Sequence, residues 1–153
     1  MTTFFETRDT REGTFTMVPN AHTEFAYVNK AKQGFMANQM QFEITITTAD
    51  QDQANGWKEV FSNLKVSENV SRFTLKRPSF LGAPVVVNKD NSLMSMEDRA
   101  KIGNGSICDV KVSHKTHPKS GTPYVCLEAI RVLELVPFVP NNMSSYDEEN
   151  FDF

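Results

Sequence analysis

The sequence IGNGSICDVKVSHKTHPKSGTPYVCLEAIRVLELVP, residues 102–137, decides the fold class. Two extended segments, 106–113 and 124–136, flank a polar segment in which Gly and Pro allow little except a loop. We therefore predict two strands joined by a hairpin loop at 114–123. Pro137 cannot donate a ladder hydrogen bond, so the second strand is expected to end there.

Alternation of apolar and polar residues predicts more strands upstream. Phe42, Ile44 and Ile46 alternate with Glu and Thr, which is the period of a strand with one buried face. The segment 72–76 alternates in the same way, and a polar, basic loop is expected at 29–35. Shorter extended segments are predicted at 14–18, 24–28 and 85–87.

Two segments have the features of a helix rather than a strand. After Asp50, apolar residues recur at three- and four-residue spacing and predict one amphipathic helix: Ala54, Trp57, Val60, Phe61 and Leu64. Ser95, with Asp98 three residues later, resembles a capping box and predicts a helix of one or two turns that ends near Gly103. Five or more strands with one or two helices predict a mainly β fold, a small barrel or sandwich.

The chain has 153 residues, which fits one domain with a buried core. Hydrophobic residues make up 39% of it and charged residues 23%, as in ordinary globular proteins. No stretch approaches the roughly 20 apolar residues of a membrane span, and the first residues lack the basic and apolar parts of a secretion signal. We therefore expect a cytoplasmic protein that does not bind membranes.

Charge is distributed unevenly along the chain. The net charge is −3, which on its own argues against a polyanionic partner. The last eight residues contain four acids and no base, so residues 1–145 have a net charge of +1. From Lys58 to Lys119, 11 basic residues stand against six acidic ones. The difference between a mildly basic body and an acidic end therefore calls for a functional explanation.

Basic and aromatic residues are interleaved at three places on predicted strands and loops. In chain order they are Tyr27, Lys30, Lys32 and Phe35; Arg72, Phe73, Lys76, Arg77 and Phe80; and Lys111, His114, Lys115, Lys119 and Tyr124. This mixture suits single-stranded nucleic acid, because cations follow the phosphates and aromatic faces stack on bases at about 1–3 kcal/mol each. The alternative is that the lysines only solvate a surface while rings fill the core. That alternative is the simpler one for Phe73 and Phe80, and it is equally supported for Phe35 and Tyr124.

The C-terminus carries a sharper pattern. Acids and aromatic rings share its last residues: Asp147, Glu148, Glu149, Phe151, Asp152 and Phe153. A tail that only kept the protein soluble would need the acids but not the two terminal rings. We therefore predict a docking peptide whose rings enter an apolar pocket while its acids meet a basic rim. The same peptide could occupy the protein's own DNA groove, where its acids would mimic phosphate.

The sequence argues against catalysis and metal binding. Cys108, His114, His117 and Cys126 are the residue types of a zinc site, but structural zinc sites bring their ligands in tight pairs, which this chain lacks. Two free thiols in a reducing compartment are the expected state. The turn at 103–105 lacks the third Gly of a dinucleotide-binding loop, and no acid is paired with a nucleophile or base. We expect neither enzyme activity nor a cofactor.

Taken together, these motifs resemble the single-stranded DNA-binding proteins of tailed phages. The likeness spans about residues 23–153 and rests mainly on the Gly-Asn-Gly-Ser turn at 103–106, the long strand at 125–135 and the acidic end that closes on Asp152-Phe153. The order of the segments 25–28, 42–46 and 84–88 is also similar.

The resemblance implies an OB fold, a five-stranded β-barrel, at residues 1–139, followed by a linker and acidic tail at 140–153. It implies binding of single-stranded DNA without sequence preference during phage-type replication and recombination, and often a homodimer. It also implies that the tail contacts replication proteins, such as DNA polymerase or helicase/primase, and competes with DNA for the groove. The alternatives are an OB-type binder of RNA or oligosaccharide and a phage structural or adaptor protein that binds no nucleic acid.

Overall fold

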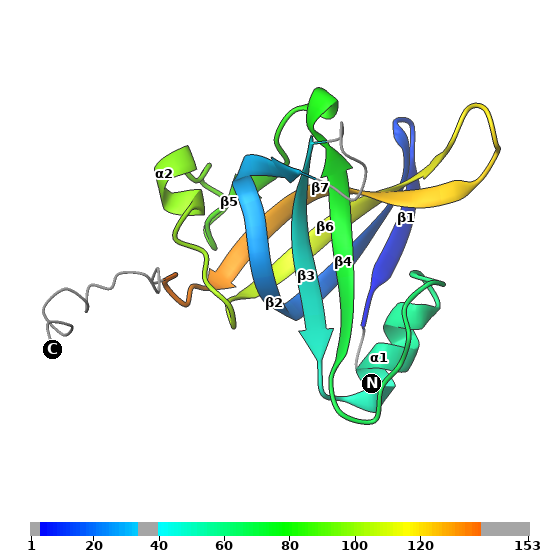
Figure 1. Ribbon diagram of the computed structural model, residues 1–153, viewed down its shortest axis with the longest axis horizontal. Helices are drawn as coiled ribbons and strands as arrows, with labels where there is room; N and C mark the ends of the chain where they lie inside the picture. The colour runs from blue at the N-terminus through cyan, green and yellow to red at the C-terminus, as the bar shows by residue number, and fades with distance from the viewer. Residues whose placement is uncertain (1–3, 34–39, 139–153) are drawn as a thin grey trace, which may run out of the picture.

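The computed structural model describes residues 4–33 and 40–138, and these are mainly β with two helices (Figure 1). In chain order the elements are β1 (Glu6–Thr10), β2 (Gly13–Gln33), β3 (Met40–Thr48), α1 (Gln51–Lys58), β4 (Ser71–Pro78), the 3-10 turn η1 (Ser79–Leu81), β5 (Val85–Val87), α2 (Met96–Arg99), β6 (Ile107–Thr116) and β7 (Pro123–Glu134). The strands form one sheet in the order β4-β3-β2-β6-β7-β5, with β1 paired to β2. The predicted mainly β architecture is confirmed.

The long strand β2 turns this sheet into a barrel. Its first part, 15–22, pairs with β6, and its later part, 22–33, pairs with β3. The register shifts near Asn20 and Phe25, whose φ angles are 53° and 50°, and such irregularities bend a strand. The two short strands predicted at 14–18 and 24–28 both lie within β2, whereas the loop predicted at 29–35 is strand as far as Gln33. The sequence did not show one continuous strand because the bulges interrupt the alternation of residue types without interrupting the strand pairing.

The core lies between the inner face of the sheet and α1. Ile44, Ile46 and Leu75 point inward from β3 and β4 and are buried. Trp57 of α1 is fully buried in the same hydrophobic cluster, as is Phe61 from the turn that follows the helix. No helix in the described part of the chain is long and apolar enough to cross a membrane.

Helix α1 is shorter than its apolar spacing predicts. Asp50 is its N-cap, and the Asp50 Oδ1 accepts hydrogen bonds from two backbone N–H groups of the first turn, at 2.9 and 3.4 Å. The helix ends at Lys58, whose Nζ donates to the carbonyl oxygen of Leu64 at 2.7 Å. Residues 59–64 continue as turns and still bury Phe61 and Leu64. The prediction of one helix through Leu64 is wrong because turns can bury residues at the same spacing.

The second helix and the last hairpin follow their predictions more closely. Ser95 caps α2, where its Oγ accepts a hydrogen bond from the Asp98 backbone N–H at 3.1 Å. β6 and β7 pair as an antiparallel hairpin as far as Thr116 and Pro123, so the connecting loop is shorter than predicted and spans 117–122. Figure 1 shows this hairpin, in yellow and orange, reaching outward beside the β1–β2 hairpin.

Candidate nucleic-acid interface

The outward face of β3 and β4 carries hydroxyl and charged side chains. In the antiparallel register, Glu43, Thr45 and Thr47 stand opposite Lys76, Thr74 and Arg72. The hydroxyls of Thr45 and Thr74 are hydrogen-bonded at 2.8 Å. Arg72 and Lys76 flank this threonine pair and are exposed. Two of the predicted nucleic-acid-binding residues therefore lie on one face of the barrel.

Part of the positive charge on this face is neutralised by the protein itself. Arg72 Nε lies 3.0 Å from Glu24 Oε1, and Lys32 Nζ lies 3.6 Å from Glu43 Oε2. Lys32 Nζ also lies 4.7 Å from the centre of the Tyr27 ring, which is cation–π distance. Lys32 and Tyr27 thus place a cation beside an aromatic ring, as the sequence predicted for this segment. The sequence did not predict the Glu43 carboxylate that lies beside the same cation.

A second basic and aromatic cluster lies on the β6–β7 hairpin. Lys111 Nζ lies 4.6 Å from the centre of the Phe15 ring on β2. The rings of His117 and Tyr124 stack with their centres 4.3 Å apart, and Lys115 is the cross-strand partner of Tyr124. Phe15 was not predicted as a site residue, because its cation is far away in the sequence and only the β2–β6 register brings the two together.

Several of the predicted phosphate-binding cations are exposed and have no acidic partner within residues 4–33 and 40–138. These are Lys30, Lys76, Lys111, Lys115 and Lys119. His114, also a predicted site residue, is held against β2 by a hydrogen bond of 2.6 Å between its Nε2 and Thr16 Oγ1. The unpaired cations therefore come from β2, β4 and the hairpin.

The fold places the predicted aromatic residues in different environments. Phe73 packs against the core, with its ring centre 4.9 Å from that of Phe61. Phe80 instead lies on η1 with 85% of its surface exposed, so it does not fill the core. Phe35 and the tail residues Asp147, Glu148, Glu149, Phe151, Asp152 and Phe153 lie outside the described residues.

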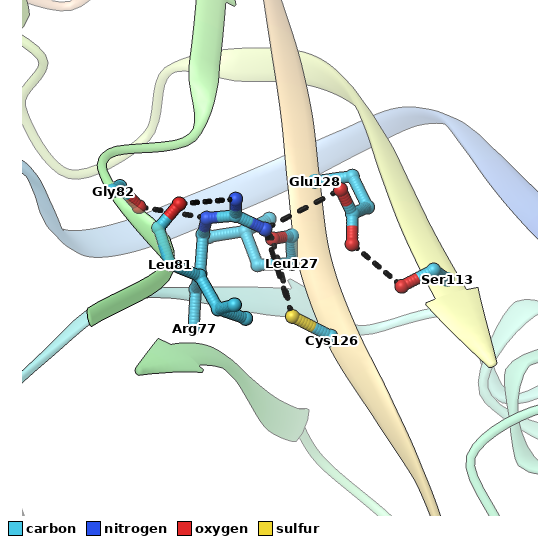
Figure 2. Close-up of polar contacts among 7 residues, drawn as sticks. All are labelled: Arg77, Leu81, Gly82, Ser113, Cys126, Leu127 and Glu128. Carbon is cyan, nitrogen blue, oxygen red and sulfur yellow. Dashed lines mark hydrogen bonds and ion pairs between the residues drawn. The ribbon is translucent and has the colours of Figure 1, made fainter. Parts of the chain in front are cut away.

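Arg77, a predicted phosphate contact, lies at the seam where β4 meets β7 (Figure 2). Its side chain is only 13% exposed, and its Nη1 lies 3.3 Å from Glu128 Oε1 and donates to the carbonyl oxygen of Leu127 at 3.1 Å. Glu128 Oε2 in turn accepts a hydrogen bond of 2.6 Å from the Ser113 hydroxyl. Arg77 is therefore bonded within the fold, whereas its neighbour Lys76 faces outward.

The charges around Cys126 link this seam to the hairpin cluster. Burial raises the pKa of the Cys126 thiol, and the carboxylate of Glu128 raises it further. The positive charges of Arg77 and Lys115 act in the opposite direction on the same pKa. Arg77 Nη1 lies 3.7 Å from Cys126 Sγ, so the end of β4 lies beside the part of β7 that leads out of the hairpin.

The four residues of zinc-ligand type do not assemble. Cys108 lies in the core on β6, where burial raises the pKa of its thiol to about 12. Its cross-strand partner is Val132, whereas that of Cys126 is Ser113, so the two thiols do not face each other. In the part of the chain that the structure covers, no three His, Cys, Asp or Glu side chains are grouped to hold a metal ion.

Solved structures of phage proteins share this fold. The single-stranded DNA-binding protein from bacteriophage Enc34, in complex with single-stranded DNA, matches with a TM-score of 0.64 at 13% sequence identity, over 87% of this chain and 93% of that one. Another structure of the Enc34 protein gives a TM-score of 0.61 at 14% identity, over 94% and 93% of the two chains. A single-stranded DNA-binding protein encoded by bacteriophage T7 gives 0.55 at 18% identity, over 80% and 92%.

Sequence comparison adds nothing to these structural matches, since no protein-family model and no curated protein matches the chain. At 13 to 18% identity the structural likeness establishes the fold. The predicted OB-type barrel is thereby confirmed, and its similarity is to phage single-stranded DNA-binding proteins, as the sequence motifs indicated.

Proposed function

We propose that this protein binds single-stranded DNA without sequence preference on the outer surface of its barrel. The observation that carries the proposal is that aromatic rings and unpaired cations occur together on β4 and on the hairpin. The exposed Phe80 follows the exposed Lys76 by four residues, and the half-buried Tyr124 lies in register opposite the exposed Lys115. Rings and cations of this kind stack bases and neutralise phosphates irrespective of sequence.

The path proposed for the strand runs from β4 across the seam to the hairpin. Lys76, Lys115 and Lys119 would contact phosphates along it, with Lys30 and Lys111 at its sides. Between the cations, Thr74 of β4 is half-buried, and its hydroxyl is hydrogen-bonded to that of the buried Thr45 on β3. A hydroxyl donates and accepts hydrogen bonds with any base, so Thr74 would add a contact without fixing a sequence.

For the tail we propose competition and recruitment. Residues 1–139 would form the DNA-binding domain, and residues 140–153 a linker and docking peptide. The acids of the peptide would occupy the same cations as phosphate does, and its terminal rings would bind replication proteins such as a polymerase or a helicase/primase. In this scheme, DNA displaces the tail and makes it available to partners during replication and recombination.

The test is a titration of intact and truncated protein with an unstructured oligothymidylate. Removal of the residues after Ser145 should tighten binding, because four competing side-chain carboxylates are lost. A matched variant with Phe151→Ala and Phe153→Ala keeps the acids, so it should bind DNA more like the intact chain while losing partner recruitment. Equal affinity of the intact and truncated chains for the oligothymidylate would show that the tail does not compete with DNA.

The same titration separates the alternative functions. Tighter binding of the ribose form of the oligomer would indicate an RNA-binding protein. Absence of binding to either form at low salt would indicate an adaptor that contacts only proteins, and it would overturn the proposed function as a whole.

A further inference from the structure

Phe80 is an exposed ring on a short but well-fixed turn. It is the middle residue of η1, which follows β4 directly, and Gly82 ends the turn with a φ of 84°. That φ lies in the left-handed region, which Gly adopts without steric cost. A large apolar side chain at 85% exposure contributes little to folding, so its conformation requires another explanation.

The side chain of Arg77 holds this turn in place. Its Nε donates to the carbonyl oxygen of Gly82 at 2.8 Å, and its Nη2 donates to that of Leu81 at 2.9 Å (Figure 2). The third nitrogen, Nη1, donates to the Leu127 carbonyl oxygen on β7. One guanidinium group thus ties both the turn and the facing strand to β4.

This connection matters because β4 and β7 share no backbone ladder in the described sheet. The contact between them therefore depends on side chains, and Arg77 spans it. Glu128, which lies opposite the guanidinium, is four residues after Tyr124 on the same strand. Arg77 consequently fixes the η1 turn relative to the strand that leads into the hairpin cluster.

We propose that Arg77 is a positioning residue that holds Phe80 as a preorganised stacking platform, and that it makes no phosphate contact of its own. The inference rests on the proposed function and assigns one ring and its support within that site. Because the backbone of the turn that carries the ring is already held in place, less conformational entropy is lost when a base stacks on the ring. Lysine cannot replace Arg77, because its single ammonium group does not reach three carbonyl oxygens in a fixed fork.

The test uses the full chain, an oligothymidylate and a double-mutant cycle. Phe80→Ala should weaken binding roughly 5- to 150-fold, the range that corresponds to one stacked base. Arg77→Lys keeps the charge and should still lose most of the same factor. The double variant Arg77→Lys/Phe80→Ala should bind no more weakly than Phe80→Ala alone, since Arg77 acts through the ring.

A structural role of Arg77 alone would not produce this coupling, because general loosening of the barrel would weaken binding with or without the ring. Additive losses in the double variant, or normal affinity of Arg77→Lys, would overturn the inference. Phe80→Trp supplies a direct readout: its indole fluorescence should be quenched by the oligomer, and less so when Arg77→Lys is added. The buried Trp57 of the unmodified protein gives the reference signal.

A second variant guards against loss of folding in Arg77→Lys. Gly82→Ala strains the turn at its φ of 84°, but the added methyl group meets no atom within 4 Å, so the barrel core is untouched. Gly82→Ala should weaken binding of the oligothymidylate. Combined with Phe80→Ala, it should weaken binding no further than Phe80→Ala does alone. If the unmodified protein binds no oligothymidylate, the proposed function fails. If it binds and Phe80→Ala binds equally well, only the present inference fails.

Discussion

The salt dependence of DNA binding can be predicted from the ion pairs of the barrel. Eight Lys and Arg residues were predicted from the sequence to contact nucleic acid. The structure pairs three of them with a carboxylate: Lys32 with Glu43, Arg72 with Glu24 and Arg77 with Glu128. A cation that keeps its carboxylate adds no net charge to the site. The five unpaired lysines should therefore set the number of phosphates that are neutralised.

Each phosphate contact with a single strand contributes about 0.7 to the slope of log affinity against log salt concentration. Five contacts give a slope of roughly −3.5, so raising the salt from about 50 to about 200 mM should weaken binding roughly 130-fold. Lys76→Gln should reduce the slope to about −2.8, because one contact is lost.

The assay is fluorescence titration of a labelled oligothymidylate at four or more salt concentrations. The double variant Lys32→Gln/Glu43→Gln is the matched control: it removes a cation together with its carboxylate and should leave the slope unchanged. Lys89→Gln, at an exposed turn beside β5, controls for general effects of charge on the protein.

Two results would refute this reasoning. A slope near −1 for the unmodified protein would show that the unpaired lysines do not contact phosphates. The other result is a slope whose magnitude decreases as much in Lys32→Gln/Glu43→Gln as in Lys76→Gln. That result would show that Lys32 leaves its carboxylate and binds the strand.

Two further predictions concern stability. Burial raises the pKa of the Cys108 thiol from 9.0 to about 12, so above pH 9 the unfolded chain loses this proton while the folded one keeps it. The free energy of unfolding should then fall by about 1.4 kcal/mol per pH unit between pH 9 and 12, and Cys108→Ala should abolish that part of the decrease in urea titrations. Gly103→Ala would place a methyl group 2.6 Å from the Val136 carbonyl oxygen, and should destabilise the fold by about 2–3 kcal/mol. Gly121→Ala, which meets nothing within 4 Å, should cost only about 1 kcal/mol, and equal losses for the two variants would contradict the steric argument.

Regular alternation made most of the barrel predictable. Phe42, Ile44 and Ile46 were assigned to a strand with one buried face, and all three are buried in β3. β2 was not predictable as one strand, because it changes its pairing partner and contains register shifts near Asn20 and Phe25. Alternation reports which face is buried, and that face changes wherever a bulge adds a residue.

The same physical rule could have distinguished Lys76 from Arg77 in the sequence. Adjacent residues of a strand point to opposite faces, so both could not contact DNA in the same way. Lys76 stands beside the outward threonines, whereas Arg77 is turned to the seam. The contact between Lys111 and Phe15, and the pairing of Lys32 with Glu43, depend on strand register and could not be predicted from composition.

A net charge of −3 is compatible with binding a polyanion because charges act over short distances in salt. At physiological ionic strength the Debye length is about 8 Å, so a phosphate senses the nearby lysines far more than the sum over the chain. Glu24 and Glu43 are already satisfied by Arg72 and Lys32, and they present little free negative charge to a strand. What decides affinity is therefore the number of cations left without a carboxylate along the path. An acidic tail in the same chain can compete for those cations because its linker keeps its local concentration high, even though its charges also make the whole protein acidic.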